Sequence, residues 1–322
     1  MGKIIILRPG ALGDFVMTLP IVAGLRERYP EAYIEVLARG SIATLAGGIA
    51  ARTGDLDAAG LHAFFAPGVP ANPKAADFIR SFDLAISWLG DDFHRAASGI
   101  GSTVVSVPPL PPHGGRSVRL NASRFFFHAV PQLRDVAWRP PQVQLTHDEQ
   151  RQAAGILNRH GLDPALPVIG IHPGSGGRLK CWPAEHFASV IRSLLANDRQ
   201  VVMFCGEADA AVVAGVQRAA GAPVPVLHEL PLRMLAAVLS LCRWYVGNDS
   251  GASHLAAAAG TDCVVLFGPT DPATWAPAGA NVRVLTADTD CRPCGQTSPA
   301  CSRRLECLSS LAPERVLAEL AR

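Results

Sequence analysis

Short apolar runs alternate with helical patterns along the chain, and this alternation is typical of β-α-β units with parallel sheets. In the first part of the sequence the pattern predicts strands at 3–7, 33–37, 83–88 and 103–107, with a helix over 16–27. Between 102 and 141 the chain is rich in Pro, Gly and Arg, so beyond the strand at 103–107 no regular structure is assigned there. The first part of the chain is therefore expected to form one parallel sheet.

A second series of strands and helices begins near residue 146, where Thr146 and Glu149 have the spacing of a capping box. The pattern predicts a helix towards His160, strands at 168–172, 200–205, 224–227, 244–247 and 262–268, and helices at 184–195, 208–220, 232–242 and 253–259. Pro140 and Pro141 interrupt regular structure just before this series. We therefore expect two doubly wound α/β domains, 1–145 and 146–322, with a cleft between them.

Composition agrees with two globular domains. The chain has 322 residues, and domains average roughly 150 residues. Apolar residues make up 49% and charged residues 17%, which excludes a disordered chain or a coiled coil. A net charge of +2 is too near neutral for a general nucleic-acid binder. The sequence shows neither an apolar run long enough to span a membrane nor a signal-peptide pattern, so we expect a cytoplasmic protein.

The loop after the first predicted strand is the first candidate for chemistry. It reads Arg8-Pro-Gly-Ala-Leu-Gly13-Asp14 and opens a helix at the sheet edge where ligands bind. Its two glycines allow a ligand close to the backbone, but their G-x-x-G spacing is not the dinucleotide fingerprint. Asp14 could cap the helix, or it could face the cleft as a general base.

The second candidate is the glycine-rich loop after strand 168–172, which contains Ser175, Gly176 and Lys180. Such a loop offers several backbone N–H groups to an anion, and the lysine adds a positive charge. The spacing differs from that of a P-loop. The alternative is a plain flexible loop with a solvated lysine.

The third candidate is the most specific, because a strand ends and a helix begins within a turn of small residues. Asp249, Ser250 and Gly251 form this turn, and His254 lies in the first helical turn. A helix N-terminus favours a phosphate or diphosphate through its free N–H groups and its dipole. His254 could instead be a buried core residue.

Together these segments resemble glycosyltransferase family 9, which contains the ADP-heptose:lipopolysaccharide heptosyltransferases. The resemblance rests on Gly13-Asp14, on Lys180-x-Trp-Pro, on Asp249-Ser-Gly-x-Ser-His254-x-Ala-Ala and on Gly-Pro-Thr-Asp-Pro at 268–272. It extends over nearly the whole chain and is strongest across 168–275. It implies a GT-B fold, in which two Rossmann-like domains face a central cleft. The N-terminal domain takes the acceptor, and the C-terminal domain takes the nucleotide sugar.

The resemblance also implies roles for individual residues. Asp14 matches the general base, and Arg8 and Gly13 lie on the acceptor side. Lys180 matches the lysine that binds the diphosphate. The donor-binding residues it implies are Ser175, Gly176, Asp249, Ser250, Gly251 and His254, with Glu207 for the ribose and the nearby Asp209 as its alternative.

The resulting hypothesis is an inverting glycosyltransferase that moves a heptose from an ADP-linked donor to a lipopolysaccharide core or a related bacterial glycan. Catalysis needs no cofactor in this scheme, because Lys180 and the helix N-terminus stabilise the departing diphosphate. Six Arg and one Asp lie between 94 and 139, as an anionic acceptor would favour. Membrane contact would be at most peripheral, at the inner face of the inner membrane. The alternatives are a GT-B epimerase or hydrolase of nucleotide sugars, and a non-catalytic nucleotide-sugar-binding protein.

Four of the eight cysteines, Cys291, Cys294, Cys301 and Cys307, lie within one short segment. The spacing of the first pair is that of a zinc or iron knuckle. A structural four-thiolate Zn or Fe site, reduced thiols and disulfides remain open as interpretations. A similar cysteine pattern occurs in many members of the resembled family. At the end of this chain we expect a C-terminal helix that could pack back on the N-terminal domain.

Overall fold

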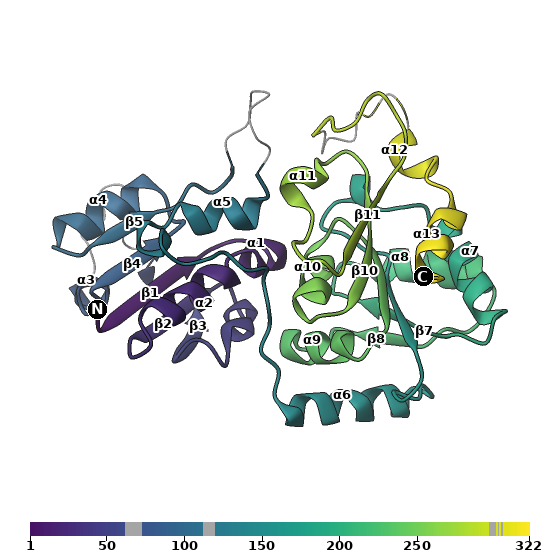
Figure 1. The fold of residues 1–322 in the computed structure, drawn as a ribbon, viewed down its shortest axis with the longest axis horizontal. Helices are drawn as coiled ribbons and strands as arrows, with labels where there is room; N and C mark the ends of the chain where they lie inside the picture. Colours follow the sequence, from purple (N-terminus) through teal and green to yellow (C-terminus); the bar gives the residue numbers. More distant parts are fainter. Residues whose placement is uncertain (62–72, 112–119, 296–300, 302, 304) are drawn as a thin grey trace. The chain divides into compact units, whose positions relative to one another are not determined.

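The computed structural model describes residues 1–61, 73–111, 120–295, 301, 303 and 305–322. Within these ranges the chain forms two compact units, Met1–Gln144 and Leu145–Arg322, each built around its own sheet (Figure 1). The division lies next to the boundary expected from Pro140 and Pro141. Across the described ranges, no helix combines the length and the apolar character that crossing a bilayer requires.

The first unit contains a five-stranded parallel sheet of order β3-β2-β1-β4-β5. Its strands are β1 (Lys3–Arg8), β2 (Tyr33–Ala38), β3 (Arg52–Asp55), β4 (Leu84–Ser87) and β5 (Val104–Ser106). The continuous aliphatic run of β1 is completely buried because helices cover both faces of a parallel sheet. Four of these strands were predicted. The sequence pattern missed β3, a short edge strand of sequence Arg-Thr-Gly-Asp without an apolar residue.

The helix predicted over 16–27 is largely confirmed as α2 (Leu19–Arg28), but a separate short helix, α1 (Leu12–Val16), precedes it. The backbone N–H and the hydroxyl of Thr18 both donate to the carbonyl of Phe15, at 2.8 and 2.6 Å, which ends α1 in a tight turn. Pro20 then occupies the first turn of α2, where its missing N–H costs nothing. The remaining described helices of this unit are η1 (Ile42–Ala46), α3 (Pro73–Arg80), α4 (Asp91–Gly99), α5 (Ala122–His128) and η3 (Pro131–Leu133).

The second unit contains a six-stranded parallel sheet of order β11-β10-β9-β6-β7-β8. Its strands are β6 (Val168–His172), β7 (Gln200–Cys205), β8 (Val226–His228), β9 (Trp244–Asn248), β10 (Asp262–Phe267) and β11 (Val282–Thr286). All except β11 follow from the sequence pattern. The pattern gave no signal for β11, which lies at an edge and is largely half-buried.

Helices flank this second sheet (Figure 1). The described helices are α6 (His147–Arg159), η4 (Arg178–Lys180), α7 (Ala184–Leu195), α8 (Ala210–Ala220), α9 (Leu232–Ser240), α10 (Gly251–Ala258), α11 (Pro272–Trp275), α12 (Glu306–Ser309) and α13 (Pro313–Leu320). The predicted capping box is present, since Thr146 Oγ1 accepts from the N–H of Glu149 and the Glu149 carboxylate accepts from the N–H of Thr146. Within the second unit, the C-terminal helix α13 packs on α7, and its buried Val316 belongs to the core of this unit.

Each sheet has one point where the strand order reverses, between β1 and β4 in the first unit and between β6 and β9 in the second. Ligands of open α/β sheets bind at the carboxyl ends of the strands at such a switch point. The loop before Asp14 follows β1, and the loops carrying Lys180 and Asp249 follow β6 and β9. The topology therefore places the three sequence candidates at the two switch points.

Candidate active site

Asn248, the fully buried last residue of β9, connects the two loops at the switch point of the second unit. Its side-chain oxygen accepts from the N–H of Trp182 at 3.0 Å. Its side-chain nitrogen donates to the carbonyls of Pro173 and Gly174, at 2.8 and 3.2 Å. One amide side chain therefore holds the glycine-rich loop between β6 and α7 at both of its ends. It does so beside the start of α10.

Lys180 meets Asp249 at this edge. The Lys180 Nζ lies 2.9 Å from Asp249 Oδ2, and the Thr270 hydroxyl donates to the same oxygen at 2.7 Å. The Asp249 side chain is 7% exposed and that of Lys180 is 28% exposed. Ser175 Oγ also donates to the backbone carbonyl of Asp249, at 2.8 Å. The lysine is therefore held in place by a buried carboxylate while its side chain remains partly exposed.

The N-terminus of α10 lies directly after Asp249. Ser250 caps the helix, with its hydroxyl accepting from the N–H of Ser253. The N–H groups of Gly251 and Ala252 donate no hydrogen bond to any described part of the chain. His254, in the first turn, is 6% exposed and thus nearly fully buried. The helix consequently presents unpaired donors and the positive end of its dipole next to Lys180, which is an arrangement suited to a diphosphate.

The glycine-rich loop is also held by the segment between β7 and α8. His172 Nε2 lies 2.9 Å from Asp209 Oδ2, which accepts from the N–H of Gly206 at 3.0 Å. The hydrogen bond with His172 lowers the pKa of Asp209. Gly174 passes so close to this carboxylate that an added Cβ would lie 1.9 Å from Asp209 Oδ1. No larger residue fits at Gly174 without moving the loop.

These contacts distinguish the two carboxylates that the sequence suggested for a ribose. Asp209 is 8% exposed, and its carboxylate is engaged by His172 and Gly206. Glu207 is exposed and makes no hydrogen bond or ion pair with the described residues. Of the two, Glu207 is the carboxylate accessible to a ligand. The exposed Gly176 likewise lies in open space, with nothing near the position of a Cβ.

Asp14 lies at the switch point of the first unit, in the first turn of α1. Its Oδ2 accepts from the N–H of Ala11 at 3.1 Å, and its Oδ1 lies 3.6 Å from Arg8 Nη2. Gly10 has φ +126°, and a Cβ there would lie 2.9 Å from Asp14 Oδ2, so the loop requires glycine at this position. The Asp14 side chain is 38% exposed. It therefore caps the helix and still presents its carboxylate to solvent. Gly13 is half-buried in the same turn.

Sequence reasoning missed two aromatic residues beside Arg8. The guanidinium carbon of Arg8 lies 4.9 Å from the ring centroid of Trp88 and 5.2 Å from that of Phe126. Trp88 directly follows β4, the strand across the switch point from β1. An aromatic residue at the end of that strand was the available signal. Its meaning depends on the strand order, which the sequence pattern does not specify.

The four clustered cysteines do not form the predicted metal site within the described residues, where no three His, Cys, Asp or Glu side chains are grouped to hold a metal ion. Cys294 is exposed and Cys307 is buried, and all eight cysteines are free. Burial raises the pKa of the Cys307 thiol, and the nearby Cys291, Cys294 and Cys301 raise it further.

The cysteine segment nevertheless contacts the loop between β10 and α11. Arg292 Nε donates to the carbonyl of Gly268 at 2.6 Å, and the N–H of Gly295 donates to the carbonyl of Pro269 at 2.9 Å. The side chain of Leu308 packs so close to Gly268 that an added Cβ would lie 2.7 Å from it. Because this loop carries Thr270, the segment supports the residues around Asp249.

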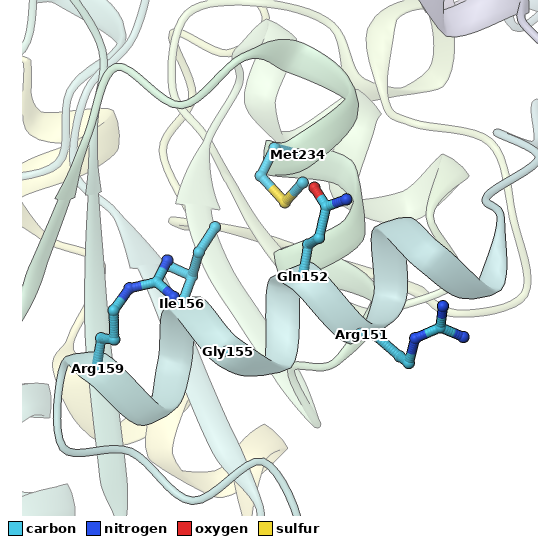
Figure 2. A pocket seen from close by; sticks show the side chains of 6 residues that line it. All are labelled: Arg151, Gln152, Gly155, Ile156, Arg159 and Met234. Carbon is cyan, nitrogen blue, oxygen red and sulfur yellow. The ribbon is translucent and has the colours of Figure 1, made fainter.

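A separate hollow of about 400 Å³ lies between α6 and α9. It is lined by Arg151, Gln152, Gly155, Ile156, Arg159 and Met234 (Figure 2). None of the predicted site residues lines it.

Comparison with known proteins shows the family of the chain. Residues 108–302 match the sequence model of glycosyltransferase family 9 (heptosyltransferase). Lipopolysaccharide heptosyltransferase 2 of Escherichia coli (strain K12) is 26% identical over 347 residues, an alignment that covers 99% of this chain and 97% of the relative.

Solved structures of this kind share the fold. A glycosyl transferase family 9 protein from Veillonella parvula DSM 2008 superposes with a TM-score of 0.81 at 22% identity, covering 99% of this chain and 96% of that one. E. coli ADP-heptose lps heptosyltransferase II gives a TM-score of 0.74 at 22% identity, covering 100% and 98%. The chain therefore belongs to glycosyltransferase family 9, and it is a glycosyltransferase with the GT-B fold.

Proposed function

We propose that this enzyme transfers a heptose from an ADP-linked donor to a hydroxyl group of a lipopolysaccharide core, with inversion at the anomeric carbon. The observation that carries the donor part is the arrangement of Lys180, Asp249 and the N-terminus of α10 at one switch point. The names of the relatives, which are lipopolysaccharide heptosyltransferases, support the choice of sugar and acceptor.

On the donor side, the diphosphate would lie against the N–H groups of Gly251 and Ala252, with the ammonium group of Lys180 beside it. Negative charge builds on the diphosphate as the bond to the sugar breaks. Donors that are already oriented stabilise that charge without rearranging during the reaction. Ser175, Gly176 and the first turn of α10 with His254 would border the same donor, and Glu207 would accept from the ribose hydroxyls.

On the acceptor side, Asp14 would take the proton of the attacking hydroxyl, while Arg8 and Gly13 shape the loop around it. The hydroxyl oxygen forms a bond to the anomeric carbon from the face opposite the departing ADP, and this gives inversion. Asp14 suits this role because its carboxylate is fixed by Ala11 and Arg8 but remains 38% exposed.

Donor recognition is tested by thermal unfolding and calorimetry with ADP, ADP-heptose and UDP. A ligand that binds only the folded protein raises its unfolding temperature by mass action. We expect ADP and ADP-heptose to stabilise the protein and UDP to do so more weakly. Lys180→Ala should weaken ADP binding at least about tenfold, since a charge-assisted contact is lost. Arg199→Ala, an exposed cation at the opposite edge of the same sheet, is the control and should change nothing.

Transfer is tested with ADP-heptose and a lipopolysaccharide core that lacks heptose. Loss of a general base typically costs about 10²–10⁴-fold in rate, so Asp14→Asn should lose transfer while it keeps its affinity for ADP. Asp148→Asn, a first-turn carboxylate of α6 in the second unit, is the matched control. ADP release that is equally fast with and without acceptor would indicate a hydrolase or epimerase. A protein without turnover, in which Asp14→Asn changes no measured property, would be a binding protein.

A further inference from the structure

Arg8 is an unusually buried cation. Its side chain is 4% exposed, although it stands at the end of β1 beside a loop that is open to ligands. Burial lowers the pKa of its guanidinium group to about 10, and the nearby charge of Asp14 opposes this shift. A buried charge is costly unless something compensates it. The only carboxylate paired with Arg8 among the described residues is that of Asp14.

Two aromatic rings from different elements supply the rest of the compensation. Trp88 follows β4 and Phe126 lies on α5, and their rings meet edge to face with centroids 6.0 Å apart. Both rings also lie within cation–π range of the Arg8 guanidinium. We call this pair, Trp88 and Phe126, the aromatic clamp.

Hydrogen bonding does not account for the buried position of the Trp88 indole ring. Its Nε1 is buried and has no hydrogen-bond partner within the described chain, which is unfavourable for an indole N–H. Its backbone N–H, by contrast, donates to the carbonyl of Leu7 at 3.1 Å, one residue before Arg8. The ring is therefore useful to this site through its face, which lies against the guanidinium group.

Arg8 in turn contacts Asp14 twice. Its Nε donates to the backbone carbonyl of Asp14 at 3.3 Å, and its Nη2 lies 3.6 Å from the carboxylate oxygen Oδ1. The other oxygen is held by the N–H of Ala11. Since α1 has only five residues, the helix alone constrains this carboxylate weakly. The direction of the carboxylate thus depends on a buried guanidinium group that packs against the aromatic clamp.

We propose that Arg8 is a positioning residue for Asp14, and that Trp88 and Phe126 act through Arg8 to hold the Asp14 carboxylate in the orientation that transfer requires. The proposal rests on the proposed role of Asp14 as general base. It assigns to Trp88 and Phe126 a function in turnover rather than in acceptor or donor binding.

The test is the kinetics of Trp88→Leu and Trp88→Phe with ADP-heptose and the heptose-deficient lipopolysaccharide core. A small displacement of a catalytic group can cost up to about 100-fold in rate. We expect Trp88→Leu to lower kcat about 10- to 100-fold with an unchanged KM for the donor. Trp88→Phe keeps an aromatic face and removes the unpaired indole N–H, so it should restore most of kcat. A purely structural role predicts neither this split between kcat and KM nor the rescue.

Trp138 provides a matched control in the same unit. Its ring lies 5.4 Å from the guanidinium carbon of Arg124, and its indole Nε1 is likewise buried without a partner among the described residues. It contacts neither Arg8 nor Asp14 through any hydrogen bond, ion pair or ring contact of the described chain. Trp138→Leu should leave kcat within about twofold of the wild-type value, because substitutions at sites that share no contacts usually act independently.

A double-mutant cycle separates this inference from the proposed function. If Trp88 acts through Asp14, the effect of Trp88→Leu on kcat disappears in the Asp14→Asn background. An unchanged effect in that background, or a wild-type kcat in Trp88→Leu while Asp14→Asn is inactive, overturns the inference alone. A fully active Asp14→Asn enzyme overturns the proposed base itself. If Trp88→Leu does not fold, Phe126→Leu and Arg8→Lys test the same coupling, with the same outcomes counting for or against it.

Discussion

The ion pair between Glu149 on α6 and Arg233 on α9 allows a quantitative test of the second unit. The Arg233 Nε and Nη2 atoms donate to the two carboxylate oxygens of Glu149 at 2.5 and 2.7 Å, and the side chains are only 22% and 19% exposed. The hydrogen bond from Arg233 is the largest cause that lowers the pKa of Glu149, from 4.5 to about 2, with further contributions from Thr146. Each unit of pKa corresponds to about 1.4 kcal/mol, so the full shift corresponds to about 3.5 kcal/mol. Solvent screens the partly exposed pair, so Glu149→Gln should remove about 2–3 kcal/mol of stability at neutral pH.

The sign of the pH dependence follows from the lowered pKa. The folded state binds the Glu149 proton less tightly than the unfolded state, so its stabilisation is complete above about pH 4.5. It is lost as the pH falls towards 2. Urea unfolding of the second unit at several pH values between 7 and 2.5 measures this loss. The Glu149→Gln protein should lack that part of the decrease in unfolding free energy, so the two curves should converge in acid.

The neighbouring pair, Asp148 with Arg151, is the control. It lies on the same helix with side chains 71% and 74% exposed, and exposed pairs contribute only about 0–1 kcal/mol. Asp148→Asn should therefore change the unfolding free energy by less than about 1 kcal/mol, with little change in its pH dependence. Equal effects of the two substitutions, or parallel curves for Glu149→Gln and wild type, would refute the assignment of the stabilisation to the α6–α9 pair. The hollow between the same helices, shown in Figure 2, contains neither Glu149 nor Arg233.

Two further predictions concern the donor loops. Gly174→Ala places a Cβ 1.9 Å from Asp209 Oδ1, and in urea unfolding it should destabilise the second unit by about 1–3 kcal/mol. The control, Gly176→Ala, meets nothing within 4 Å and should unfold like wild type. Equal stabilities of the two variants would contradict the packing argument. Thr270→Val keeps the shape of the side chain but removes a 2.7 Å hydrogen bond to the buried Asp249 carboxylate. We expect the free energy of unfolding to fall by about 1.5–3 kcal/mol and ADP binding, measured by calorimetry, to weaken. Unchanged values for both would show that this bond does not support the site.

Much of the local structure could be predicted from short-range patterns. The aliphatic run of β1, the capping box of Thr146 and Glu149, and the Ser250 cap of α10 all depend on residues a few positions apart. Helix starts and buried strands are governed by such neighbours, because caps and side-chain periodicity act within one or two turns. The same patterns identified Lys180 and Asp249 as belonging to loops, and the resemblance to a family identified them as donor residues.

The sequence could not show which of these residues meet. Lys180 and Asp249 are far apart in the chain, and they come together because β6 and β9 are neighbours in the sheet. The pairing of β6 with β7 likewise brings Asp209 to His172, while Glu207 remains exposed. Strand order is a property of the whole sheet, and no local pattern specifies it.

In the first unit, too, local sequence determined some features and tertiary packing determined others. Sequence alone placed Asp14 after β1 and at the start of a helix, and both statements hold in the structure. It did not show that Arg8 is buried between Trp88 and Phe126, whose elements lie far along the chain. Local preferences determined which segments become strands, helices and loops. The burial of a charge, and the partners that make this burial tolerable, were decided only when the sheet and its helices packed together, because desolvation depends on every element that surrounds the group.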